Sequence, residues 1–330
     1  MSVQLYNPFE NLFLDDKTCF LTGDELSSPE DNITVFPEWI LDRFDYRERS
    51  FQMIDSVNSF LYKDLKLPCS ERIKKEFDKL DLEVMAAFDL GYHGVKNLDS
   101  QRLFLWISRI VYGTLFNELK LEKAMKQKVD KEFKLSASLQ ERFSYFHLML
   151  QSLIAPMAFE EPKPWSIAVV KVKYSEEIFN YRDDAVNLIF SLGIKGFGIV
   201  ACLQDNAIVM AKQQEVLDKI GDTELHPVQF EELCARVLYT NYLLQDRPKY
   251  ALSSTDDGFL IKYQAPDSAD NLPKFATWSN EMFGQVLEDY WTPWGLKKEN
   301  ITVFPNPPVS FLEAPHSLDF VNPEGIKLPY

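Results

Sequence analysis

The spacing of apolar residues along the first half of the chain has the period of an α-helix. Apolar side chains recur at intervals of three and four residues over 37–65, in two pieces, and again over 71–88, 101–117 and 136–154. This spacing places them on one face of a helix, so each of these stretches is predicted to be helical. Residues 101–117 are apolar around most of the circumference, which predicts a central, buried helix.

The pattern changes after residues 155–164, APMAFEEPKP, which contain three prolines and no periodicity. Beyond them SIAVVKVKY alternates between apolar and polar positions, and the apolar runs NLIFSLG and FGIVACL flank a short turn. Such runs are typical of antiparallel strands, and AIVMA at 207–211 is predicted to be another strand. A helix is predicted from Pro227 to about Leu244, because proline suits a first helical turn, and a last amphipathic helix covers 276–291.

This change of pattern predicts an α+β protein in two domains. Residues 1–158 form the mostly helical part, and residues 159–330 form a mixed α+β domain with an antiparallel sheet. A chain of 330 residues is long enough for two domains of ordinary size. Its apolar content of 46% and aromatic content of 14% suit packed cores rather than disorder.

The charge balance argues against nucleic acid as a partner. The chain carries 50 acidic and 35 basic residues, a formal net charge of −15. Residues 1–70 alone contain 13 acidic and 6 basic side chains. Because proteins bind nucleic acid mainly by neutralising phosphates with lysine and arginine, an acidic surface opposes that association.

Cysteine usage and the N-terminal residues point to the cytoplasm. Four cysteines lie far apart, which does not suggest a disulfide framework. The first residues, MSVQLYNPFE, lack the basic and apolar regions of a signal peptide. No apolar run approaches the length of a membrane span, so we expect no membrane association.

Two short cysteine-containing segments frame an extended stretch and a helix start. The first cysteine turn reads Cys19-Phe20-Leu21-Thr22, and the second cysteine turn reads Cys69-Ser70-Glu71-Arg72, just before a helical pattern. Between them lies Thr34-Val35-Phe36-Pro37-Glu38-Trp39. This order resembles the HNH endonucleases of the treble-clef type, which have a CxxC knuckle, a histidine in a phrase such as H-hydrophobic-hydrophobic-P-x-W, and a second CxxC that enters a helix.

The resemblance implies a degenerate treble-clef-like finger, joined to the helical bundle, whose chemistry has been lost. The matching zinc-ligand positions are Cys19, Thr22, Cys69 and Arg72, so each turn keeps one cysteine of two. A structural zinc ion requires four nitrogen or sulfur ligands. The position of the catalytic histidine is Thr34, which cannot act as a base at neutral pH. The resemblance therefore implies no catalytic residue, no bound metal and no cofactor, and a role as a scaffold or protein-interaction module with another protein as partner.

Two alternatives remain open from the residues themselves. In the first, the chain is a divergent metal-dependent nuclease that binds Mg²⁺ through Asp31, Glu38 and Asp42. Carboxylates near helix starts are also common for capping reasons alone. In the second, the resemblance is accidental and the chain is an unrelated α+β protein whose function the sequence does not show.

The six residues NITVFP occur twice, at 32–37 and at 300–305. The flanking residues do not match, whereas a duplicated domain would repeat more than six residues. We interpret the repeat as a coincidence of strand and proline composition.

Overall fold

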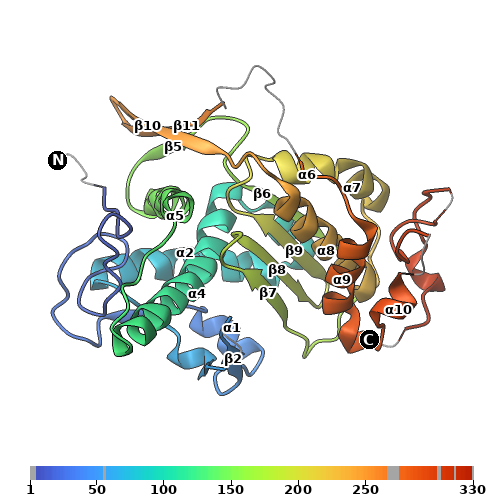
Figure 1. The fold of residues 1–330 in the computed structure, drawn as a ribbon, viewed down its shortest axis with the longest axis horizontal. Helices are drawn as coiled ribbons and strands as arrows, with labels where there is room; N and C mark the ends of the chain where they lie inside the picture. Colours follow the sequence, from blue (N-terminus) through green and yellow to red (C-terminus); the bar gives the residue numbers. More distant parts are fainter. Residues whose placement is uncertain (1–4, 55–56, 266–274, 303–305, 316, 329–330) are drawn as a thin grey trace. The chain divides into compact units, whose positions relative to one another are not determined.

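The computed structural model describes residues 5–54, 57–265, 275–302, 306–315 and 317–328, and it confirms the α+β class. These residues form two compact units (Figure 1). The first unit combines the described residues of Met1–Leu90 with Asn97–Glu160 and Tyr250–Lys262, and the second contains the rest. The boundary between residues 158 and 159 stays a prediction, because compactness alone does not test whether two domains fold independently.

The first unit opens with a small antiparallel pair. Strand β1 (Asn32–Thr34) pairs with β4 (Lys66–Pro68), with Thr34 opposite Lys66. Between these strands the chain forms α1 (Glu38–Arg43), a hairpin of β2 (Ser50–Gln52) and β3 (Ser59–Leu61), and the short 3-10 helix η1 (Tyr62–Asp64).

The prediction of helix over 37–65 is therefore right only for α1 and wrong beyond it. Ile54 and Val57, which counted toward a helical stripe, are 64% and 85% exposed. Phe51 is buried, but in a strand, where it packs against Phe36 and Tyr62 with ring centroids 5.8 and 5.3 Å away. In β2 only Phe51 points toward the core, while Ser50 and Gln52 are exposed. The local structure is therefore set by the packing of Phe51 and not by a helical repeat of apolar residues.

Three long helices complete the first unit: α2 (Glu71–Asp89), α4 (Ser100–Lys128) and α5 (Ala137–Leu150), extended by the 3-10 helix η2 (Gln151–Leu153). Helix α4 packs against both α2 and α5, and it is buried along most of its first half, as the sequence predicted. A small sheet of β10 (Lys249–Thr255), β11 (Gly258–Gln264) and β5 (Met157–Phe159) closes the unit, with β5 parallel to β11.

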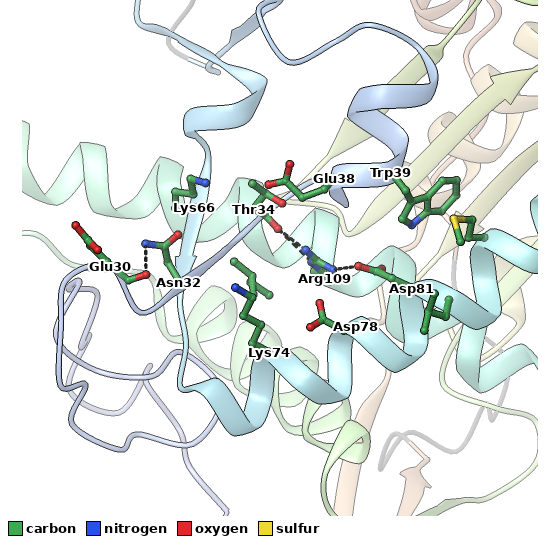
Figure 2. Close-up of a pocket in the computed structure, with 13 residues that line it drawn as sticks. Glu30, Asn32, Thr34, Glu38, Trp39, Lys66, Lys74, Asp78, Asp81 and Arg109 are labelled. Atoms are coloured by element: carbon green, nitrogen blue, oxygen red, sulfur yellow. Dashed lines mark hydrogen bonds and ion pairs between the residues drawn. The ribbon is translucent and has the colours of Figure 1, made fainter.

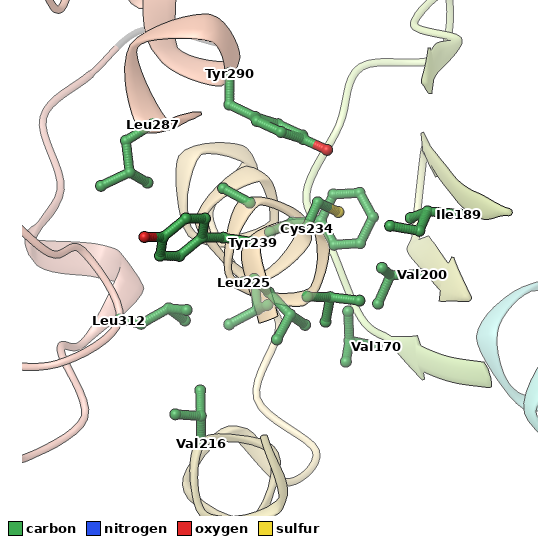
Figure 3. Packing of buried hydrophobic residues seen from close by; sticks show 14 of the residues in the cluster. Val170, Ile189, Val200, Val216, Leu225, Cys234, Tyr239, Leu287, Tyr290 and Leu312 are labelled. Carbon is green, nitrogen blue, oxygen red and sulfur yellow. The ribbon is translucent and has the colours of Figure 1, made fainter. Parts of the chain in front are cut away.

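The second unit is built on a four-stranded antiparallel sheet in the order β6-β9-β8-β7. Its strands are β6 (Ser166–Val170), β7 (Asn180–Asp184), β8 (Ile189–Ile194) and β9 (Phe197–Cys202). Helix α8 (Pro227–Leu243) packs on the sheet and α9 (Asn280–Trp291) packs on α8. Figure 3 shows the resulting core, with Cys234 on the side of α8 that faces Ile189 and Val200 of the sheet, and Tyr239 on the opposite side of α8.

The remaining elements of the second unit are short. They are α3 (Gly91–Asn97), α6 (Ile208–Lys212), α7 (Gln214–Ile220), η3 (Thr292–Trp294), α10 (Lys298–Ile301) and η4 (Pro323–Gly325).

The prediction of a strand at 207–211 is wrong, because these residues lie mostly in helix α6. The buried carboxylate of Asp205 accepts a hydrogen bond from Val209 N at 3.0 Å and so stabilises the start of this helix. Residues 303–305 of the second NITVFP segment lie outside the described residues. No helix in the described part of the chain is long and apolar enough to cross a membrane.

A C-terminal segment with little regular structure is held by two side chains of α8. The carboxylate of Glu232 accepts from the backbone N–H groups of Phe311 and Leu312, at 2.6 and 3.0 Å. The amide of Gln229 donates to the carbonyl oxygens of Phe311 and Val321, both at 2.8 Å. Both side chains are buried, so these bonds satisfy polar groups that would otherwise be costly.

Two glycines allow α8 to approach the sheet. Gly193 and Gly198 are register partners in the β8–β9 hairpin. A Cβ atom on Gly198 would come within 2.4 Å of the Phe230 ring, and one on Gly193 would come within 2.4 Å of Tyr174. The aromatic rings therefore occupy the space that a larger residue would need.

We predict that Gly198→Ala lowers the free energy of unfolding by about 1–3 kcal/mol through overpacking against Phe230. Gly325→Ala is the control, because a Cβ atom there meets nothing within 4 Å; it should change stability by no more than about 0.5 kcal/mol. Denaturant titration of both variants measures the difference. Equal stabilities would contradict the proposed close contact.

Candidate functional site

The first unit contains a cavity of about 500 Å³, with a mixed polar and apolar lining, beside the β1–β4 pair (Figure 2). Its walls come from β1, α1, β4, α2 and α4. The strand pair places Thr34 and Lys66 at one side, while the first turns of α2 supply Lys74 and Asp78. Ligand sites in proteins commonly have volumes of about 300–1,000 Å³.

The floor of the cavity is built on a buried arginine. Nε and Nη2 of Arg109, on α4, donate to the carbonyl oxygen of Thr34 at 3.2 and 2.6 Å. Nη1 donates to Oδ2 of Asp81, on α2, at 2.7 Å. The two side chains of this ion pair are only 4% and 14% exposed. One planar guanidinium group therefore joins α4 to both β1 and α2.

The electrostatics of the floor are set by burial. Removal from water raises the pKa of Asp81 above its ordinary value, Arg109 opposes that rise, and the neighbouring Asp78 carboxylate adds to it. The ion pair and its hydrogen bonds offset part of the cost of burying the Asp81 carboxylate, but not all of it, since its pKa stays raised.

Three buried polar atoms along the cavity have no hydrogen-bond partner among the described residues. They are Oγ1 of Thr34, Nε1 of Trp39 and Oδ1 of Asp81. Thr34 is 3% exposed, so its hydroxyl is buried in the wall. Nearly all buried polar groups in proteins are hydrogen-bonded, so these three atoms are exceptions. Each is shielded from solvent and therefore lies within the wall rather than at its surface.

The structure brings the four predicted ligand positions of the two cysteine turns into one neighbourhood. Phe20 N donates to the carbonyl oxygen of Pro68 at 2.8 Å, which places the first cysteine turn beside the end of β4. Both Cys19 and Cys69 are buried and unbridged. Burial raises the pKa of the Cys69 thiol to about 12, and the nearby Cys19 contributes to the rise.

The two other positions, Thr22 and Arg72, are joined through a third residue. Thr22 Oγ1 donates to Oδ2 of Asp24 at 2.7 Å, and Nη2 of Arg72 lies 3.8 Å from the same oxygen. Asp24 therefore connects the first cysteine turn to the start of α2. Both members of the Arg72–Asp24 pair are mostly exposed, so this pair contributes little stability.

The alternative carboxylate residues do not form a group of three that could hold a metal ion. Asp31 accepts a hydrogen bond from Ser28 N at 2.9 Å within its own turn. Glu38 and Asp42 both pair with Arg47, and only Glu38 lines the cavity. The described residues contain no group of three or more His, Cys, Asp or Glu side chains that could hold a metal ion.

The most buried charged residue of the site, Arg109, was not predicted from the sequence. Arg109 lies within the apolar stretch 101–117, and a lone charge in such a helix requires a buried partner. That signal was present in the sequence. Its partners were not visible, because Thr34 and Asp81 are 75 and 28 residues away.

The first cysteine turn is also held from α5. Nε2 of His147 lies 2.7 Å from the Phe20 carbonyl oxygen, and Nδ1 lies 3.2 Å from Nε2 of Gln151. This arrangement fits a neutral ring that donates through Nε2 and accepts at Nδ1. His147 is fully buried, and burial lowers its pKa to about 4.

Comparison of the chain with protein-family models, with curated proteins and with solved structures finds no match.

We predict that Arg109→Met lowers the free energy of unfolding by about 3–5 kcal/mol, because it leaves the Asp81 carboxylate buried without its cation. The double variant Arg109→Met/Asp81→Leu should recover much of that loss, since neither charge then remains buried. Denaturant unfolding of the three proteins measures both effects. A double variant as unstable as Arg109→Met would show that the ion pair is not the cause.

We predict that His147 makes the free energy of unfolding fall in acid. His147 binds a proton more tightly in the unfolded chain than in the folded chain, because burial lowers its folded-state pKa to about 4. Its contribution to the free energy of unfolding is therefore constant above about pH 6.5, and about 3 kcal/mol is lost as the pH falls from about 6.5 to about 4. In His147→Phe this part of the pH dependence should disappear. Unfolding free energies of both proteins across this range test it, and parallel curves would contradict it.

Proposed function

We propose that this chain is a non-catalytic protein similar to HNH endonucleases of the treble-clef type, and that it works in the cytoplasm as a scaffold or protein-interaction module. The observation that carries the proposal is the link from Thr22 through Asp24 to Arg72. In the family, the positions of Thr22 and Arg72 would hold zinc ligands. Here polar side chains join the same two segments, next to the two remaining cysteines.

The chemistry of the cavity supports an inactive site. A nuclease must take a proton from water and stabilise the charge of the phosphate with a cation. Thr34, at the position of the base, has a hydroxyl group that is not basic at neutral pH. Asp81, which lines the same cavity, accepts a hydrogen bond from Arg109 at one carboxylate oxygen, so that oxygen is not free to bind a divalent cation.

The partner that fits this proposal is another protein. The net charge of −15 opposes the counterion release that drives binding to DNA. The alternative nuclease with Asp31, Glu38 and Asp42 is less well supported, since Glu38 and Asp42 are both already paired with Arg47. If the chain is instead an unrelated α+β protein, the cysteine turns are not expected to form a zinc site.

Placing cysteine at the two positions that lack it, 22 and 72, tests the proposed relationship to HNH endonucleases. The double variant Thr22→Cys/Arg72→Cys should bind about one zinc ion per chain, because Cys19 and Cys69 supply the other two thiolates of a tetrahedral site. The wild-type protein should bind none. Elemental analysis after dialysis against zinc measures the stoichiometry.

The matched control is Thr22→Cys/Lys75→Cys, which has the same number of cysteines but places one on another exposed position of α2. If both double variants bind zinc equally, or if neither does, the resemblance to a treble clef is not supported.

A plasmid-cleavage assay with Mg²⁺ and Mn²⁺ tests the proposed lack of activity. We expect no cleavage by the wild-type protein. The comparison protein carries Ala at positions 31, 38 and 42. Cleavage by the wild type that disappears in this variant would establish the carboxylate nuclease in place of the scaffold.

A further inference from the structure

We propose that an exposed aromatic patch, where the end of α8 meets the start of α9, binds an arginine-containing segment of another protein. The aromatic patch consists of Tyr242, in the last turn of α8, and of Trp278 and Met282, on either side of the first residue of α9. This inference names a surface and a kind of partner for the proposed interaction module, and to that extent it rests on the proposed function. It uses only residues of the second unit.

The three side chains of the aromatic patch are large and mainly apolar, and all are exposed: Tyr242 by 65%, Trp278 by 41% and Met282 by 47%. Apolar residues exposed singly are ordinary, but exposed apolar side chains that gather mark interaction sites. The centroid of the buried Tyr239 ring lies 6.5 Å from that of Tyr242 and 4.6 Å from that of Trp278. Two exposed aromatic rings therefore flank one buried ring. Tryptophan and tyrosine are the residues that most often dominate the binding energy of protein interfaces.

The aromatic patch is held in place by the groups beneath it. Ala276 N donates to the Leu243 carbonyl oxygen at 2.7 Å, which joins the segment before α9 to the end of α8. The Tyr239 hydroxyl donates to the Ser279 carbonyl oxygen at 3.3 Å and accepts from Ser279 N at 3.1 Å. The backbone on both sides of Trp278 is therefore fixed before a partner arrives. A surface prepared in this way loses less conformational entropy on binding than a flexible loop does.

The charge around the aromatic patch favours a cationic partner. The two segments that form it, residues 237–246 and 275–291, contain four acidic residues and no lysine or arginine. The acidic residues are Asp246, Glu281, Glu288 and Asp289. Asp246 and Glu281, four and three residues after the two exposed rings, are themselves exposed. Such a surface attracts a basic segment and repels an acidic one.

Two basic residues next to these segments leave the imbalance of charge in place. Nζ of Lys298 lies 3.5 Å from a Glu281 carboxylate oxygen, but both side chains are exposed, so the pair contributes little. Arg247 directly follows the first segment, and its guanidinium group donates to the side chains of Asn241 and Asn187. This arginine is partly buried, so it is directed into the unit rather than toward a partner.

Arginine is the basic residue that fits an aromatic surface best. Its planar guanidinium group stacks on aromatic rings and is more weakly hydrated than the ammonium group of lysine. The chain makes the same contact elsewhere: Cζ of Arg182 lies 4.4 Å from the centroid of the Tyr290 ring, and Cζ of Arg43 lies 5.0 Å from that of Trp39. The exposed rings of the aromatic patch can receive a partner's arginine in this way, with carboxylates in the same segments to balance its charge.

Fluorescence anisotropy of labelled peptides at physiological salt tests the proposal. The probe is a short peptide of alternating arginine and leucine, and two comparison peptides have lysine or glutamate in place of arginine. We expect the arginine peptide to bind the wild-type protein with a Kd below about 100 μM. The lysine peptide should bind at least about threefold more weakly, because its ammonium group does not stack on a ring. The glutamate peptide should not bind.

Two single variants locate the binding site. Trp278→Ala and Tyr242→Ala should each weaken binding of the arginine peptide at least about tenfold, as expected for aromatic residues at the centre of an interface. Phe13→Ala is the control, because it removes an exposed aromatic side chain of the first unit, and it should bind like the wild type. Tyr242 is mostly exposed, so Tyr242→Ala should keep the Tm of the wild type, which separates loss of binding from loss of folding.

Two double variants with the same change of charge test the carboxylates. Asp246→Asn/Glu281→Gln should weaken binding of the arginine peptide at least about threefold, because it removes negative charge from the segments that carry the rings. Asp319→Asn/Glu324→Gln removes the same charge from exposed positions of the C-terminal segment that Gln229 holds near the start of α8. It should change the Kd by less than about twofold, since charges separated by more than a Debye length are largely screened.

Four results would overturn the proposal. The first is no binding of the arginine peptide at concentrations up to roughly 1 mM. The second is equal binding of the arginine and lysine peptides. The third is that Trp278→Ala and Tyr242→Ala bind as well as Phe13→Ala. The fourth is a wild-type dimer in sedimentation velocity that Tyr242→Ala converts to a monomer, because the aromatic patch would then be an interface between copies of this chain.

The zinc and plasmid experiments change residues of the first unit, whereas the peptide experiment reads out a surface of the second unit. A result against the resemblance to HNH endonucleases and a result against this binding surface are therefore distinguishable.

Discussion

The buried ion pair of Arg109 and Asp81 is the constraint on which the first unit depends. A guanidinium group in the interior is tolerated only when its donors are used, and here they are divided between the end of β1 and the middle of α2. The positions of α4, β1 and α2 are therefore linked, since moving any one of them would leave a buried charge or carbonyl group unsatisfied. The same requirement keeps the floor of the cavity polar.

Buried polar side chains on helices also fix the irregular parts of the chain. His147 and Gln151 hold Phe20 and Tyr6 in the first unit, and Glu232 and Gln229 hold the C-terminal segment in the second. Segments without helices or sheets have backbone groups that secondary structure does not satisfy. A few well-placed side chains supply those bonds, which explains why long loops in both units follow defined paths.

The proposed function concerns the cysteine turns and the cavity beside β1, which both belong to the first unit. Under the proposed resemblance, the cysteine turns are the segments that metal ligands would join in an HNH endonuclease, and here a backbone hydrogen bond from Phe20 to Pro68 connects them. The residue at the proposed position of the base is Thr34, whose hydroxyl group does not activate water at neutral pH. On this proposal the chain can still bind a partner, because binding needs only complementary groups, whereas hydrolysis also needs a base and a cation.

The sequence alone determined the α+β class, the central helix over 101–117, the antiparallel strands after residue 164 and the helix beginning at Pro227, because these depend on periodic patterns over many residues. It could not determine the hairpin of β2 and β3 or the helix at 208–212, where short segments take their structure from tertiary contacts and a cap. The cysteine turns were visible as a motif, but the cavity was not. Its groups come from positions 30 to 109 of the chain, and only folding brings such distant side chains, with their complementary charges, to one place.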